Sequence, residues 1–227
     1  MDNSFSKYTV EIVFVIDATG SMGEFIDEVK QMAVNFHKML ADGLVAEKKG
    51  IESLRARVIT FRDIPEEGDD AIRWSEFFEL PDQGERFSEY IESIEAMGGG
   101  DEPESALDAL WVAIRSPWRK TRFKSRQIIV IFTDASAHPV SGRKPRNFQD
   151  SVPFAATIHD IQSGWGTAAR TGFMDPKSKR LLVFAPSVDP WTEIDKWENV
   201  TRFPSQAGNG CTDLSMKKII ALLVGTV

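Results

Sequence analysis

Apolar residues follow two spacings along this chain, and each spacing predicts a type of secondary structure. Residues 10–16 and 127–133 are nearly continuous apolar runs rich in β-branched side chains, the pattern of parallel strands buried on both faces. From Ser21 through Leu40, apolar residues recur at every third or fourth position, which predicts one long helix with one buried stripe. Strand and helix patterns alternate along most of the chain, so we expect a parallel sheet with helices on both faces.

Six segments have the strand pattern, and six have the helix pattern. Strands are expected at residues 10–16, 54–61, 72–80, 127–133, 180–185 and 201–203. Helices are expected at residues 21–40, 84–97, 103–114, 153–161, 191–198 and 213–223. The turn-rich sequence DIPEEGDD separates the second and third strands, which predicts an antiparallel pair with the third strand at the edge. The fold class is therefore α/β: a doubly wound, mainly parallel six-stranded sheet with one antiparallel edge strand and helices on both faces.

Length and composition indicate one globular unit. The chain has 227 residues, of which 42% are hydrophobic and 27% charged, close to the averages for globular proteins. We expect a single domain, residues 1–227, because one large α/β sheet accommodates this length. Residues 135–151 are rich in Pro, Gly, Arg and Lys and have no apolar period, which predicts a long surface loop.

Net charge and cysteine content exclude several classes of function. The formal net charge of -7 argues against general affinity for nucleic acid or for an anionic membrane surface. Cys211 is the only cysteine, so neither an internal disulfide nor a thiolate metal cluster is possible. The N-terminal sequence has no leader pattern, and its apolar block is too short to span a bilayer. We expect a cytoplasmic protein without membrane insertion.

Oxygen-bearing side chains follow the expected strand ends. Asp17, Thr19 and Ser21 come after the first strand, Asp101 after a triple glycine, and Asp134 after the fourth strand. In open α/β sheets, ligands bind beyond the carboxyl ends of the strands. Hydroxyl and carboxylate oxygens are the ligands that Mg²⁺ prefers, and Mg²⁺ usually keeps several waters. If the first and fourth strands are neighbours, these residues form a divalent-cation site.

The motifs DATGS, GGGDEPE and IFTDA resemble those of the von Willebrand factor type A domain with a metal-ion-dependent adhesion site. The resemblance covers nearly the whole chain and is closest to the intracellular and bacterial branch of the family. It implies a Rossmann-like sheet and places Asp17, Thr19, Ser21, Asp101 and Asp134 at the five metal positions. The implied cofactor is Mg²⁺, with Mn²⁺ or Ca²⁺ as alternatives. Asp101 departs from the threonine usual in extracellular members, which predicts tighter cation binding and weaker attraction for an acidic ligand.

The resulting functional hypothesis is a protein-binding module in which an oxygen of a partner protein, acidic or otherwise, completes the metal coordination. Its oligomeric state is not predicted. One alternative is an enzyme that uses the same ion for phosphoryl transfer or a phosphatase-type reaction. The aspartyl phosphotransferase pattern is absent at Asp17, and no catalytic lysine is placed by the sequence, so we assign no catalytic residue. A second alternative is a structural domain with a vestigial site.

A few further residues have more than one interpretation. Asp17 and Asp134 also suit the capping of turns when each is taken alone. Glu102 and Glu104 are expected to serve the dipole of the following helix. The triple glycine has no Lys-Ser or Lys-Thr after it, so we interpret it as close backbone approach to the metal loop rather than as a phosphate loop. Trp165, in the sequence SGWGT, is expected to be exposed on a partner surface. His138 is the only histidine close to the proposed site in sequence.

Overall fold

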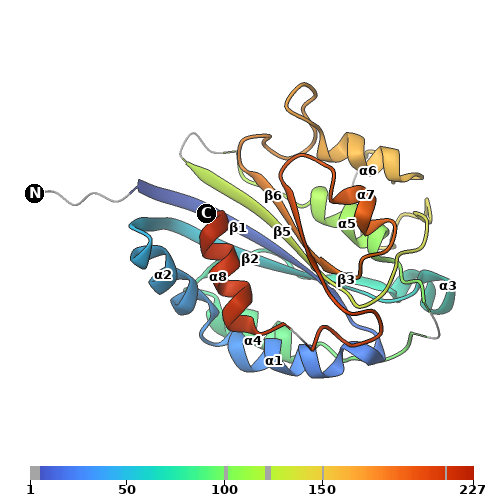
Figure 1. Ribbon diagram of the computed structural model, residues 1–227, viewed down its shortest axis with the longest axis horizontal. Coiled ribbons are helices and arrows are strands. Elements are labelled where there is room, and N and C mark those ends of the chain that lie inside the picture. The colour runs from blue at the N-terminus through green and yellow to red at the C-terminus, as the bar shows by residue number, and fades with distance from the viewer. Residues whose placement is uncertain (1–5, 100–101, 121–123, 150, 213) are drawn as a thin grey trace, which may run out of the picture.

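A seven-stranded sheet forms the centre of the computed structural model, which describes residues 6–99, 102–120, 124–149, 151–212 and 214–227 (Figure 1). The strands are β1 (Ser6–Asp17), β2 (Lys49–Phe61), β3 (Ile72–Trp74), β4 (Phe78–Leu80), β5 (Ser125–Phe132), β6 (Lys179–Ala185) and β7 (Val200–Pro204). Their order is β3-β2-β1-β5-β6-β7, and β4 also pairs with β2. The strands β1, β2, β5, β6 and β7 are parallel to their neighbours in this group, whereas β3 and β4 run antiparallel to β2. The predicted fold class is confirmed.

The sheet has one strand more than predicted because the edge strand expected at residues 72–80 is broken. Ser75 is responsible, since its hydroxyl oxygen accepts a hydrogen bond of 3.0 Å from Val58 N, the donor that a continuous ladder would pair with a carbonyl. Beyond this point the pairing shifts by one residue, from Ile59 opposite Trp74 to Ala56 opposite Phe78. The predicted strand is therefore divided into β3 and β4.

Within the described part of the chain, eight α-helices pack on the two faces of the sheet (Figure 1). They are α1 (Gly23–Ala33), α2 (Phe36–Ala46), α3 (Ile64–Glu67), α4 (Gly84–Glu92), α5 (Ala106–Ile114), α6 (Ile158–Trp165), α7 (Trp191–Ile194) and α8 (Met216–Thr226). The long helix predicted from Ser21 is interrupted, because Asn35 leaves the helical conformation with φ −107° and ψ 2°. The predicted start of α6 at residue 153 was too early: Thr157 and Asp160 form a capping box that fixes the start at Ile158.

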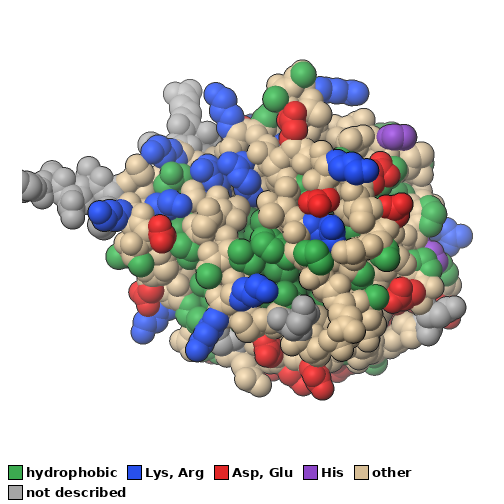
Figure 2. Space-filling view, in the orientation of Figure 1, with side chains coloured by type: hydrophobic (Ala, Val, Ile, Leu, Met, Phe, Trp, Pro, Cys, Tyr) green, Lys and Arg blue, Asp and Glu red, His purple; other side chains and the backbone are tan. Residues whose placement is uncertain are grey.

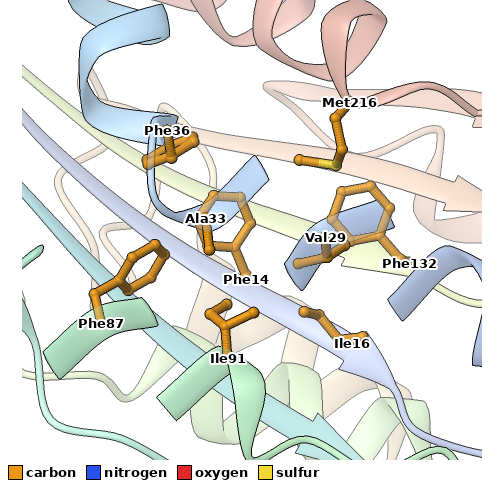
Figure 3. Close-up of a pocket in the computed structure, with 9 residues that line it drawn as sticks. All are labelled: Phe14, Ile16, Val29, Ala33, Phe36, Phe87, Ile91, Phe132 and Met216. Atoms are coloured by element: carbon orange, nitrogen blue, oxygen red, sulfur yellow. The ribbon is translucent and has the colours of Figure 1, made fainter. Parts of the chain in front are cut away.

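Alternating side chains of the central strands divide the core into two clusters. On β1, Val10, Ile12, Phe14 and Ile16 face one cluster, which α1, α2, α4 and α8 cover. A cavity within this cluster is lined by apolar side chains from β1, β5 and these four helices (Figure 3). Val13 and Val15 face the second cluster, which α5, α6 and α7 cover. Both faces are buried, as expected for a parallel sheet.

In the segment predicted as a loop, residues 135–151, the described residues form no helix or strand apart from a single bridge between Ala137 and Glu104. Ser141 anchors it to α5 through a hydroxyl that donates to Asp108 Oδ1 over 2.5 Å. The predicted exposure of Trp165 was wrong. Its ring is fully buried in the second cluster, and its Nε1 donates to Glu198 O over 2.8 Å.

Charge is unevenly distributed between the two ends of the strands. In Figure 2, Lys and Arg side chains gather near the amino ends of β1, β5 and β6. Lys124 and Arg126 contribute to this group and lie over the ring of Tyr8. None of the described helices combines the length and the apolar character needed to cross a membrane.

Candidate metal centre

The candidate site lies where the strand order reverses, at the carboxyl ends of β1 and β5. These two strands are hydrogen-bonded neighbours, and Ile16 pairs with Phe132 just before both end. Asp17 is the last residue of β1, and Asp134 follows β5 by two residues. The topology therefore brings two distant acidic residues to one rim of the sheet, at the position where α/β sheets bind ligands.

Hydrogen bonds connect four of the five predicted metal-site residues in one chain. Asp17 Oδ1 accepts from Thr19 N over 3.0 Å and from Thr19 Oγ1 over 2.7 Å. Thr19 Oγ1 lies 3.4 Å from Ser21 Oγ, which donates to Asp134 Oδ1 over 3.0 Å. Asp101, the fifth predicted residue, lies outside the described residues. The structure thus joins the DATGS loop directly to the loop after β5.

Two residues missed in the sequence analysis hold these aspartates in place. Thr133 Oγ1 donates to Asp17 Oδ2 over 2.6 Å, and Gly210 N donates to Asp134 Oδ2 over 2.7 Å. Gly210 has φ +56°, and a Cβ there would lie 2.1 Å from Ser21 O, so only glycine fits. Thr133 directly precedes Asp134 in sequence, whereas the position of Gly210 depends on the return of the chain from β7.

The triple glycine contacts the DATGS loop through its backbone, as interpreted from the sequence. Gly20 N donates to Gly98 O over 3.2 Å. Gly99 has φ +76°, and a Cβ there would lie 2.9 Å from the side chain of Thr19. Of the three glycines, Gly98 and Gly99 belong to the described residues, and both line the same hollow as Thr19, Ser21 and Asp134.

Glu104 also lines this hollow, which corrects its expected role at the helix dipole. It lies before α5, where its N donates to Ser136 O over 3.1 Å and its O accepts from His138 N over 2.8 Å. Its side chain is only 4% exposed, and Oε2 has no hydrogen-bond partner among the described residues. No sequence signal indicated this role of Glu104, because the bridge to the 135–151 loop forms only in the folded chain.

Negative charge accumulates here without a positive partner. Asp17, Asp134 and Glu104 are 0%, 2% and 4% exposed, and none of them forms an ion pair with a described Lys, Arg or His side chain. Burial raises the pKa of Asp17 to about 6, although hydrogen bonds from Thr133 and Thr19 oppose the change. Burial also raises the pKa of Glu104 to about 8, and repulsion from neighbouring carboxylates adds to the effect.

The adjacent charged residues are paired with each other. His138 Nε2 lies 3.2 Å from Asp63 Oδ1, and Arg62 forms a 2.6 Å ion pair with Glu67. Ser105 Oγ also donates to Asp63 Oδ1 over 3.3 Å. His138 therefore contacts Asp63, while Arg62 pairs with Glu67.

The donor set fits a hard dication better than a transition metal. Among the described residues, no three His, Cys, Asp or Glu side chains gather closely enough to hold a metal by themselves. The available donors are instead carboxylate and hydroxyl oxygens, which suit Mg²⁺ with several retained waters. The buried Glu104 Oε2 without a partner agrees with this interpretation, because a buried carboxylate is stable only when its charge is compensated.

Comparison with known proteins gives a family match in the middle of the chain. A family model described as von Willebrand factor A domain matches residues 78–144, a range that contains Glu104 and Asp134. Human von Willebrand factor A domain-containing protein 7 is 34% identical over 125 residues, covering 54% of this chain and 11% of that protein. Alpha-protein kinase vwkA of Dictyostelium discoideum is 24% identical over 144 residues, covering 63% of this chain and 21% of the kinase. The chain thus spans about a tenth to a fifth of the length of these relatives.

Solved structures share the fold at low sequence identity. The pilus adhesin SpaC from Lactobacillus rhamnosus GG superposes with a TM-score of 0.52 at 10% identity, covering 96% of this chain and 30% of the adhesin. Proximal thread matrix protein 1 from the mussel byssus superposes with a TM-score of 0.50 at 14% identity, covering 97% of this chain and 46% of that protein. Both similarities concern the fold alone.

Proposed function

We propose that the chain is a von Willebrand factor A domain that acts as a protein-binding module, and that its ligand binding depends on a divalent cation; the family match over residues 78–144 supports this. Domains of this family are generally interaction modules, and the pilus adhesin with the same fold is a binding protein by its name. In our proposal Asp17, Thr19, Ser21 and Asp134 hold Mg²⁺, or Mn²⁺ or Ca²⁺ in its place. The cation acts as a Lewis acid that attracts an oxygen of the partner protein.

The hydrogen bond between Ser21 and Asp134 is the observation that supports this proposal most. It joins residues 113 positions apart in the sequence, and it aligns two hydroxyls between two buried carboxylates. Turn capping by isolated aspartates, the simpler interpretation, does not require these two loops to meet. Asp101 remains a predicted fifth ligand.

The phosphoryl-transfer alternative is disfavoured by the surroundings of Asp17. Its two carboxylate oxygens are engaged by Thr19 and Thr133, and its side chain is fully buried, so it is not placed to attack a substrate. The described residues that line the hollow include no Lys, Arg or His to hold a phosphoryl group. We therefore propose a binding function rather than catalysis.

Cation titration by isothermal calorimetry tests the proposal. The wild-type protein is expected to bind Mg²⁺ or Mn²⁺ at one site, and Ser21→Ala to bind at least about tenfold more weakly. Asp134→Asn, which removes a proposed ligand charge, is also expected to weaken binding. Its matched control is Asp82→Asn, because Asp82 is exposed and lies in the turn after β4. Wild-type protein that binds none of Mg²⁺, Mn²⁺ and Ca²⁺ would overturn the proposal.

Affinity capture on immobilised protein then separates binding from a purely structural role. Partners are expected to be retained in Mg²⁺ and released by EDTA, and Ser21→Ala is expected to capture them poorly. Partners that stay bound in EDTA would favour the structural alternative. Hydrolysis of a generic phosphate ester that Asp134→Asn abolishes would instead favour the enzyme.

A further inference from the structure

We propose that Glu104 supplies a third negative charge to the cation, in addition to Asp17 and Asp134, and thereby makes the site prefer an uncharged oxygen of the partner. The preferred ligand is then a hydroxyl or an amide carbonyl rather than a carboxylate. This inference depends on the cation site proposed above and extends it to a residue and a ligand class.

The placement of Glu104 is built into the fold. Its backbone is held by hydrogen bonds to Ser136 and His138, and its side chain lines the hollow. A Cβ on Gly99 would lie 3.2 Å from Glu104 Oε1, so a glycine at this position leaves room for the carboxylate. The same missing Cβ leaves room for Thr19, and one glycine therefore brings both side chains to the hollow.

The missing partner of Glu104 Oε2 distinguishes this carboxylate from its neighbours. Asp63 contacts His138 and accepts a hydrogen bond from Ser105, and Glu67 is paired with Arg62, so both carboxylates have partners within the protein. A structural role as a protonated acid would require an acceptor for the proton. Glu104 Oε2 has no such partner in the described part of the chain. An external cation is the compensation that remains.

Charge balance then determines the class of ligand. The two described carboxylates of Asp17 and Asp134 neutralise a dication, and a partner carboxylate adds one negative charge in excess. With Glu104 present, an excess exists before any partner binds, and an acidic ligand increases it in a buried setting where charges interact strongly. The predicted ligand Asp101 would add to the same excess. The described acids do not gather into a closed ligand set, so the role of Glu104 is charge compensation rather than completion of a cage.

Calorimetric titration with Mg²⁺ alone tests the first part. Glu104→Gln is expected to weaken binding by about ten- to a hundredfold, the usual effect of removing a group that supports a metal site. Glu92→Gln is the matched control, because it removes the same charge from an exposed side chain at the end of α4 that does not line the hollow, and it is expected to change affinity less than about twofold.

The outcomes of this titration are separable. Equal affinity in Glu104→Gln and wild type would overturn the inference and leave the proposed function intact, whereas absence of binding in wild type would remove both. If Glu104→Gln does not fold by circular dichroism, Glu104→Asp replaces it. That variant keeps the charge and is expected to lose less affinity than Ser21→Ala; an equal or greater loss would contradict charge compensation.

Water proton relaxation of the Mn²⁺-loaded protein tests the second part, with sodium acetate as the probe and sodium chloride as the control for ionic strength. With enough protein present to bind all the Mn²⁺, the acetate concentration that displaces half of the metal-bound water is expected to be at least about threefold lower for Glu104→Gln than for wild type. Equal displacement from the two proteins would overturn the preference for an uncharged ligand.

Discussion

The two halves of β1 each contain a buried carboxylate, Glu11 near the middle of the strand and Asp17 at its carboxyl end, and their surroundings differ. Glu11 and Asp17 lie on the same strand, face the same side of the sheet and are 1% and 0% exposed. Glu11 forms an ion pair with Arg55, and both its oxygens accept from Arg119 N over 3.1 Å. Asp17 accepts only from uncharged groups of Thr19 and Thr133, and its nearest charged neighbours are acids.

The difference shows which of the two carboxylates has its charge compensated by the protein itself. Burial of an ion is costly unless it is paired, because the protein interior solvates charge poorly. For Glu11 the fold supplies its own cation, Arg55, from the paired position on β2. At the carboxyl end three acids have no cation among the described residues, which agrees with a site that receives one from outside.

Loss of the internal cation is expected to have the largest effect on stability. Arg55→Met leaves the buried Glu11 charge unpaired, and we expect the free energy of unfolding to fall by about 3–5 kcal/mol in urea titrations. The double variant Glu11→Gln/Arg55→Met should recover much of this loss. Addition of Mg²⁺ should not rescue Arg55→Met, and a rescue would show that the two carboxylates of β1 are not independent.

The pH dependence of the metal-free protein should reveal the uncompensated end. Asp17 and Glu104 have raised pKa values of about 6 and 8, so the folded state binds more protons than the unfolded chain from about pH 4 to pH 8. The free energy of unfolding should therefore decrease as pH rises through this window in urea titrations, with Asp17 contributing up to about 3 kcal/mol and Glu104 extending the decrease towards pH 8. Glu104→Gln should remove the part of the decrease near pH 8. A decrease that persists in saturating Mg²⁺ would argue against a cation that compensates these acids.

A lysine introduced at the rim would give Asp17 a positively charged neighbour within the protein, as Glu11 already has in Arg55. Glu104→Lys places an ammonium group beside Asp17 and Asp134, so the metal-free protein should gain about 1–2 kcal/mol at pH 8. Mg²⁺ binding should be lost in calorimetry, and the thermal midpoint should no longer respond to Mg²⁺. Retained Mg²⁺ binding would place the cation away from Glu104.

The smallest effect is expected from the exposed side chain of Arg119. It contacts Glu11 through its backbone N, whereas its guanidinium pairs with Glu79 at the surface. Arg119→Ala should therefore change the free energy of unfolding by less than about 1 kcal/mol, because exposed ion pairs contribute little. A loss close to that of Arg55→Met would mean that the guanidinium, and not the backbone, stabilises Glu11.

The order of elements and much of the site were predictable because their signals are local. The apolar run before Asp17 marks a strand end, and Thr19 and Ser21 follow at a spacing that turn capping alone does not require. The break of the edge strand was not predictable, because it depends on a Ser75 hydroxyl that replaces a ladder acceptor for Val58 on another strand. The burial of Trp165 likewise depends on contacts with the distant residue Glu198.

The sequence by itself determined the strand and helix pattern and the oxygen donors at the ends of β1 and β5, because periodicity and residue type act over a few neighbouring positions. Only the tertiary structure decided that Ser21 meets Asp134, that Gly210 closes the site and that Glu104 enters it without a partner. Those contacts join segments that are distant in sequence and that the strand order and the connecting loops bring together. Which buried carboxylates lack a positively charged partner is decided only once these segments meet.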